Sequence, residues 1–309
     1  MKRVHLIAAA LLAAAATTAP ASAAPADLMT PAGPVHTSAA RGPLRPVDFA
    51  PFKGRSSSEV LAGPASGLDS SWVIYTRLAP RAAPLGSISL PVDHTYLVLK
   101  GQANVEIGNE RFVIKPETMV LLPAGTPHRI WNASGEEADV FEVITPAPQR
   151  DLAGLIRPAA PRRVPNAASL VRVAPPLGEL AGGTGHASLN ERILASRATG
   201  SLNVLERLND MLPGGGRTET HLHPFDQVYF VRKGEMAVIY GMKTYVAKAN
   251  TLVVLPVGVV HNNTNASNSV QSIVTLLLPE PEKGQPLGQG VTLSGSAAAA
   301  APQRGAAQP

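Results

Sequence analysis

The chain has 309 residues, 45% of them hydrophobic, which is enough for two domains with buried cores. It has no cysteine, which excludes disulfides, thiolate metal sites and cysteine nucleophiles, so a transition metal could be held only by His, Asp, Glu or Gln. The formal net charge of +5 is spread along the chain, and no basic stripe is interleaved with aromatic residues, so nucleic-acid binding is not expected.

The first 23 residues have the features of a cleavable secretory signal. Lys2 and Arg3 form a positive start, residues 6–16 are an apolar run, and the Ala-Ser-Ala segment 21–23 supplies the small residues that signal peptidase reads. The apolar run is shorter than the ~20 residues that a transmembrane helix needs. We therefore expect an exported protein, periplasmic or secreted, without stable membrane insertion.

Turn-rich and low-complexity stretches divide the remaining chain. We expect an irregular lead-in over 24–55, a first β domain over 56–146, a linker over 147–189, a second β domain over 190–280 and a disordered low-complexity tail over 281–309. Within both domains, short apolar runs bounded by Gly, Pro, Asn or Asp are typical of strands in a sandwich or barrel. These runs cover residues 72–75, 96–99 and 119–122 in the first domain, and 228–231, 236–240 and 252–255 in the second.

The two domains are copies of one another at an offset of 133 residues, without a gap. The matched pairs include Asp93 and Asp226, Tyr96 and Tyr229, Gly101 and Gly234, Pro123 and Pro256, Gly125 and Gly258, His128 and His261, and Asn132 and Asn265. Turn residues and strand residues agree together, which chance hydrophobicity would not produce. The sequence therefore predicts a duplicated all-β domain.

Four side chains of the second copy have the spacing of a metal site. His221 and His223 lie two residues apart, so they project from the same face of a strand. Gln227 follows a predicted turn, and His261 follows a second turn at Pro-Val-Gly, residues 256–258. Three imidazoles and one amide oxygen that converge inside a barrel are a plausible ligand set for a divalent metal.

This pattern resembles the two motifs of the cupin superfamily. The first motif reads Gly215, His221-x-His223, Gln227 and Gly234, and the second reads Pro256-x-Gly258, His261 and Asn265. The resemblance implies two tandem cupin barrels of the jelly-roll, or double-stranded β-helix, type, with His221, His223, Gln227 and His261 as the metal ligands. Glu is the usual ligand where this chain has Gln227, and Asn250 stands where the family usually has a glycine. A barrel that binds a small molecule without a metal is the alternative.

The first copy keeps the fold residues and lacks the metal pair. His128 stands at the place of the last histidine and His94 at the place of the glutamine, whereas Ile88 and Leu90 replace the two leading histidines. We interpret the first copy as a structural or ligand-binding barrel and not as a second metal site. Glu117 replaces the usual motif glycine there.

The ligand set indicates which chemistry the second copy could support. Three neutral imidazoles and an amide leave the charge of a divalent cation uncompensated, which favours an anionic small-molecule substrate. We favour Fe²⁺ as the metal, with Mn²⁺, Ni²⁺ or Zn²⁺ as alternatives. By strand parity, Glu219 shares the face of His221 and Tyr229 shares that of Gln227, so both are candidate catalytic residues; their alternatives are a solvated carboxylate and a packed core tyrosine.

The leading functional hypothesis is a dioxygenase acting on a small acidic or phenolic substrate. A lyase or isomerase acting on a carboxylated sugar or keto acid is the alternative within the enzymes, and a non-catalytic binding protein is the alternative outside them. Cupins commonly associate through outer strands, so the sequence is compatible with a homodimer and equally with a monomer whose two barrels pair with each other.

Overall fold

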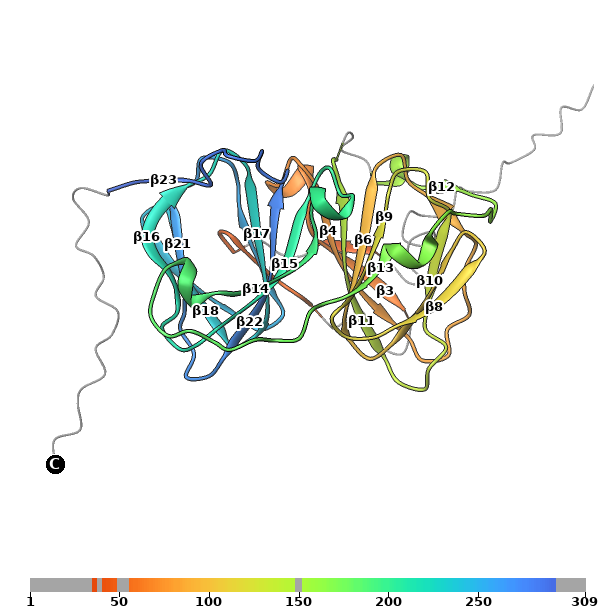
Figure 1. Ribbon diagram of the computed structural model, residues 1–309, viewed down its shortest axis with the longest axis horizontal. Coiled ribbons are helices and arrows are strands. Elements are labelled where there is room, and N and C mark those ends of the chain that lie inside the picture. The colour runs from red at the N-terminus through yellow and green to blue at the C-terminus, as the bar shows by residue number, and fades with distance from the viewer. Residues whose placement is uncertain (1–34, 38–40, 49–55, 148–151, 293–309) are drawn as a thin grey trace, which may run out of the picture.

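The computed structural model describes residues 35–37, 41–48, 56–147 and 152–292. It confirms the predicted all-β architecture of two tandem barrels, which lie side by side in Figure 1, the first in orange to green and the second in cyan to blue. The predicted signal, residues 1–23, and the end of the predicted tail, residues 293–309, lie outside the described residues. Within the described part, no helix is long and apolar enough to cross a membrane.

Each barrel consists of two sheets packed face to face, in which the strands pair antiparallel except for the parallel pair β1 and β3. The first barrel combines a sheet in the order β1-β3-β4-β11-β6-β9-β13 with a sheet in the order β12-β5-β10-β7-β8. Their bounds are β1 Val35–Thr37, β3 Ser57–Ala62, β4 Trp72–Leu78, β5 Ile88–Ser89, β6 Asp93–Lys100, β7 Ala103–Ile107, β8 Glu110–Ile114, β9 Thr118–Leu122, β10 His128–Trp131, β11 Ala138–Thr145, β12 Arg157–Pro158 and β13 Val171–Val173.

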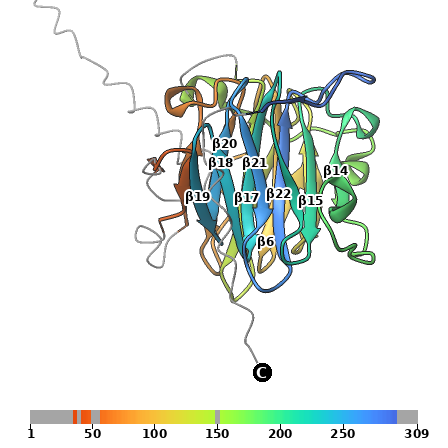
Figure 2. The same ribbon diagram turned by 90° about the vertical axis from the view of Figure 1, so that its left-hand side faces the viewer.

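The second barrel repeats this plan, and Figure 2 shows it from its outer side. One sheet has the order β14-β15-β22-β17-β20-β2 and the other β19-β18-β21-β16-β23. The bounds are β2 Leu44–Pro46, β14 Asn190–Ala195, β15 Leu205–Met211, β16 Gly216–Leu222, β17 Asp226–Lys233, β18 Glu235–Tyr240, β19 Lys243–Lys248, β20 Thr251–Leu255, β21 His261–Asn265, β22 Gln271–Leu278 and β23 Gln289–Gly290. Short 3-10 helices at Pro64–Ser66, Ala153–Leu155, Ala167–Leu170, His186–Ser188 and Arg197–Thr199 lie in the connections.

The two barrels pack against each other through their larger sheets. One continuous apolar cluster includes Tyr75 and Phe141 of the first barrel and Phe230 of the second, with the ring centroids of Phe141 and Phe230 5.1 Å apart. Strands β9 and β20 are therefore buried on both faces, one toward the barrel interior and one toward the other barrel. This double burial is the reason that residues 119–122 and 252–255 are continuous apolar runs and do not alternate.

The strand registers confirm the duplication. His128 on β10 lies opposite Ile88 on β5, and His261 on β21 lies opposite His221 on β16. These partners differ by the same 133 residues, so Ile88 occupies the place of His221, as the sequence comparison predicts.

Three segments that were predicted as an irregular lead-in, a linker and a disordered tail contribute strands to the barrels where the structure describes them. In the lead-in, β1 joins the first barrel, and β2 adds an edge strand to β20 of the second. In the linker, β12 pairs with β5 and β13 pairs with β9. At the start of the tail, β23 pairs with β16. Each of these strands has only two or three residues, too few for a readable hydrophobic period.

Glu117 and its counterpart Asn250 both have left-handed backbone conformations, with φ of 63° and 62°. A glycine adopts this conformation without a steric cost, which explains why it is the usual residue there. The Glu117 carboxylate accepts hydrogen bonds from Arg192 (2.6 Å) and Arg232 (3.2 Å) of the second barrel. Glu117 therefore connects the two barrels.

Candidate metal centre

The three histidines of the second copy converge inside the second barrel. His221 lies near the end of strand β16, directly opposite His261 on β21, and His223 follows in the turn toward β17. The three side chains are buried, and their candidate ligand atoms all lie within 4.8 Å of one another. Two ligands bound about 2.1 Å from one ion lie at most about 4.2 Å apart, so small side-chain movements suffice to close the set around a metal.

Backbone carbonyls hold the three imidazole rings in place. Nδ1 of His221 donates to the carbonyl of Glu219 at 2.8 Å, Nδ1 of His261 donates to that of Val259 at 2.9 Å, and Nδ1 of His223 donates to that of Leu287. Because Nδ1 carries the proton in each ring, the lone pair lies on Nε2. Such hydrogen bonds are typical of histidines that bind a metal through the other nitrogen.

The surroundings keep two of these imidazoles neutral. Burial, together with the neighbouring His221, lowers the pKa of His223 to about 4. Burial lowers the pKa of His261 to about 3. Neutral imidazole is the form that binds a metal, so these two rings are ready for coordination at neutral pH.

Gln227 completes the predicted ligand set. It is buried on β17, and its Oε1 lies 2.9 Å from Nε2 of His261. With the proton of His261 on Nδ1, both facing atoms are hydrogen-bond acceptors. A cation between them would satisfy both lone pairs, as would rotation of the amide so that its NH₂ group faces the ring. The donor set therefore fits a divalent metal with N and O ligands.

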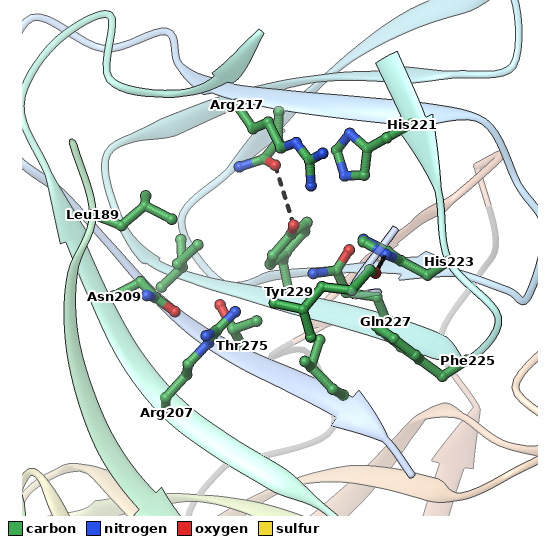
Figure 3. A pocket seen from close by; sticks show the side chains of 14 residues that line it. Leu189, Arg207, Asn209, Arg217, His221, His223, Phe225, Gln227, Tyr229 and Thr275 are labelled. Carbon is green, nitrogen blue, oxygen red and sulfur yellow. Dashed lines mark hydrogen bonds between the residues drawn. The ribbon is translucent and has the colours of Figure 1, made fainter. Parts of the chain in front are cut away.

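The cluster opens into a pocket in the barrel interior (Figure 3). Its lining consists of Leu189, Arg207, Asn209, Arg217, His221, His223, Phe225, Gln227, Tyr229, Asn263, Ile273, Thr275, Leu277 and Leu287. These described lining residues include two arginines and no carboxylate. Phe225 stacks on the ring of His223 with centroids 4.7 Å apart and fixes one side of the pocket.

A protein-family model matches the chain in both barrels. The model of the cupin domain family Cupin_2 matches twice, at residues 77–144 and 208–276, once in each barrel. The chain is a bicupin of the cupin superfamily.

Several solved structures share the fold of this bicupin. AerE from Microcystis aeruginosa has a TM-score of 0.55 at 15% identity, with 77% of this chain and 97% of that chain covered. A variant of the oxalate decarboxylase OxdC from Bacillus subtilis has a TM-score of 0.55 at 14% identity, with 74% and 73% covered. Vicilin from Corylus avellana (hazelnut) has a TM-score of 0.53 at 12% identity, with 72% and 81% covered. A search of curated proteins found no sequence match. At these identities the likeness shows the fold alone.

The position expected for the Glu219 side chain is wrong. Its side chain is exposed and is not among the residues that line the pocket. Strand β16 contains a bulge: the four-residue step from Arg217 to His221 lies opposite a two-residue step on β21. Such a bulge breaks the two-residue alternation on which the expectation depended. The Glu219 carbonyl orients His221, and Arg217 lines the pocket instead.

Tyr229 lies in the pocket, as strand parity predicts. Its ring is buried, and its hydroxyl donates to Oδ1 of Asn263 at 3.1 Å. Burial raises the Tyr229 pKa well above its ordinary value of 10, so the phenol keeps its proton. It is therefore suited to donate or relay a hydrogen bond and not to act as a base.

In the first barrel of the bicupin, apolar side chains fill the corresponding space. Ile88 and Leu90 pack with Trp72 and Ile74 in one buried cluster, which the linker residue Leu155 also joins. The sequence comparison identified the loss of the two histidines. It did not identify the apolar cluster that fills this space, because Leu155 and Trp72 contribute to the cluster from segments outside the motifs.

A chain of buried hydrogen bonds lies beside that apolar cluster. His128 Nδ1 bonds the Thr126 carbonyl at 2.8 Å, His128 Nε2 lies 3.2 Å from His94 Nδ1, and His94 Nε2 lies 3.2 Å from Glu142. Thr76 donates to the other oxygen of Glu142. Burial raises the pKa of Glu142 to about 8 and lowers the pKa values of His94 and His128 to about 3. All three groups are therefore neutral at pH 7. The protonated Glu142 carboxyl can then donate to Nε2 of His94, Nδ1 of His94 to Nε2 of His128, and Nδ1 of His128 to the Thr126 carbonyl.

Proposed function

We propose that the second barrel of this bicupin is the site of a metal-dependent enzyme that acts on a small anionic substrate, with dioxygenase chemistry. The observation that carries the proposal is the convergence of three buried histidines on a pocket whose only charged lining residues, within the described chain, are Arg207 and Arg217. A divalent cation adds two further positive charges. A substrate carboxylate or phenolate is the charge that such a pocket requires.

His221, His223, His261 and Gln227 would hold the metal, for which we favour Fe²⁺, with Mn²⁺, Ni²⁺ or Zn²⁺ as alternatives. Bound iron(II) supplies redox chemistry with positions open to both substrate and dioxygen, whereas the other metals act as Lewis acids toward a carbonyl. The Bacillus subtilis oxalate decarboxylase, which shares the fold, is described as having Mn(II) centres.

The other pocket residues have roles that their contacts suggest. Arg217 lies beside His221 in Figure 3 and is placed to pair with a substrate carboxylate next to the metal. Tyr229, held by Asn263, would orient a substrate oxygen with its phenolic hydroxyl. The geometry does not support a catalytic role for the Glu219 carboxylate, because this side chain is exposed.

The lining also bears on the type of reaction. A lyase or isomerase acting on a keto acid or carboxylated sugar needs a group that moves a proton in the transition state. No carboxyl group lines the described pocket, and Tyr229 holds its proton firmly. This favours oxygen insertion, which needs no protein carboxyl group, over proton-transfer chemistry.

Oxygen consumption tests this proposal. Purified protein reconstituted with Fe²⁺ is offered small keto acids, phenols and hydroxybenzoates in an oxygen electrode, beside the same protein stripped by a chelator and the variant His261→Ala. Iron-dependent uptake that both controls lack supports the dioxygenase. Substrate conversion without oxygen uptake would support the lyase or isomerase, and binding without conversion would support a non-catalytic binding protein.

We also propose export to the periplasm or medium on the basis of the N-terminal segment. Fractionation of the producing cells, with N-terminal sequencing of the mature protein, tests this. A chain that begins at Ala24 outside the cytoplasm supports export, and an intact N-terminus inside the cytoplasm refutes it. The packing of the two barrels within one chain is compatible with a monomer, and light scattering would distinguish it from a homodimer.

A further inference from the structure

The far side of the pocket contains buried polar atoms that have no partner. Asn209 and Thr275 are each 1% exposed, and among the described residues neither amide atom of Asn209 nor the hydroxyl of Thr275 makes a hydrogen bond. Nε of Arg207, directly across the strand pair from Thr275, is also unpaired. Figure 3 shows these three side chains together, across the pocket from His221 and His223. We call them the distal polar site.

Unpaired polar atoms in a barrel interior are destabilising unless something else satisfies them. The first barrel shows how the same positions are satisfied without a ligand. Thr76 and Glu142 stand at the places of Asn209 and Thr275, bond to each other, and are tied to His94. The place of Arg207 is taken there by apolar Ile74. The polar groups of the first barrel therefore bond to one another, whereas those of the second barrel face a cavity beside the metal ligands.

The donors of the distal polar site define what would satisfy it. The Asn209 NH₂ group, the Thr275 hydroxyl and Arg207 Nε are three donors that converge from two neighbouring strands. The nearest countercharge is Glu191, which pairs with NH1 of Arg207 at 2.9 Å from the outer, more exposed side and does not line the pocket. A carboxylate has two oxygens and about four acceptor sites, so it matches three donors and an adjacent guanidinium.

We propose that the distal polar site binds a second carboxylate, so that the substrate is a small dicarboxylic acid. One end lies at the metal and Arg217, and the other is held by Arg207, Asn209 and Thr275. This inference rests on the proposed function for the metal end, and it adds the substrate class. It also assigns the specificity of the enzyme to residues outside the metal motifs.

Binding to the zinc-loaded protein tests the inference, because zinc occupies the site without redox turnover. Calorimetry compares straight-chain dicarboxylates of three to six carbons with monocarboxylates of equal length. We expect at least one dicarboxylate to bind about 10-fold or more tightly than its monocarboxylate, as one additional charged hydrogen-bonded contact allows. Equal affinity of the two series in metal-loaded protein would overturn this inference and leave the metal site intact, whereas failure of the wild type to take up metal would overturn both proposals.

Two near-isosteric variants separate recognition from structure. Thr275→Val and Asn209→Leu should each remove about 10-fold of the dicarboxylate affinity while leaving monocarboxylate affinity and metal content unchanged. Neither should lower the unfolding temperature, because each removes polar atoms that have no partner to lose. Thr244→Val, at an exposed position of β19, is the matched control. Unchanged dicarboxylate binding in both variants, or a lowered unfolding temperature with unchanged binding, would show that these groups have a structural role only.

Discussion

Replacement of Glu142 by glutamine should stabilise the protein, by an amount that grows with pH. Glu142 is fully buried, and burial raises its pKa from 4.5 to about 8. In the unfolded chain the carboxyl loses its proton near pH 4.5, whereas in the folded chain it keeps the proton until about pH 8. Its contribution to stability is therefore fully present below pH 4.5 and is lost as pH rises toward 8.

The magnitude follows from these two values. Each pH unit between 4.5 and about 8 costs the folded state about 1.4 kcal/mol, so the full cost is about 5 kcal/mol. A glutamine removes the titration and keeps the contacts, because its oxygen can accept from Thr76 and its NH₂ group can donate to Nε2 of His94. The variant should thus match the wild type near pH 4.5 and exceed its free energy of unfolding by about 3 kcal/mol at pH 7 and about 5 kcal/mol above pH 8.

Urea unfolding at pH 5, 6, 7 and 8, followed by tryptophan fluorescence, measures this difference. The variant Glu110→Gln, at an exposed position of β8, controls for the loss of one carboxylate. Subtracting the free energy of unfolding of the wild type from that of the variant at each pH removes the contribution of the other buried groups. A difference that does not change with pH, or a variant less stable than the wild type at pH 8, would refute the reasoning and show that Glu142 is ionised and paired with a protonated His94.

Two further predictions concern the tail and the barrel interface. A Cβ at Gly288 would lie 2.8 Å from Nδ1 of His223, whereas one at Gly290 would meet nothing within 4 Å. We therefore expect Gly288→Ala to lower zinc affinity about 10-fold in competition with a chelator, with Gly290→Ala as the control. A normal zinc affinity in Gly288→Ala, or a lowered one in Gly290→Ala, would contradict the assigned role of the tail. Glu117→Gln removes the negative charge that two arginines of the other barrel share. It should therefore cost about 1–2 kcal/mol of unfolding free energy at low salt and less in 1 M NaCl, and a cost that is absent at low salt would contradict the contact.

The sequence predicted those features whose information lies within a few residues. His221 and His223 two residues apart on a strand, and His261 after a Pro-Val-Gly turn, are local patterns, and the structure brings the three together. The duplication was equally readable, because turn glycines and strand residues recur at one offset. The two barrels and the predicted position of Tyr229 follow from the same local patterns.

Features that depend on long-range register could not be predicted. Glu219 turns outward because of a bulge that only the pairing with β21 reveals. The contact of Leu287 with His223 comes from a segment whose Gly- and Pro-rich composition indicated disorder. Arg207 and Asn209 lie on β15, outside both cupin motifs, so no spacing rule connected them with the histidines.

Metal analysis of the purified protein tests the central claim most directly. The mature protein, as isolated or after reconstitution, should contain one equivalent of a divalent transition metal, and the double variant His221→Ala and His261→Ala should contain none while keeping its fold by circular dichroism. A wild type that binds no metal after reconstitution, or a double variant that retains a full equivalent, would contradict the assignment of the second barrel as a metal centre.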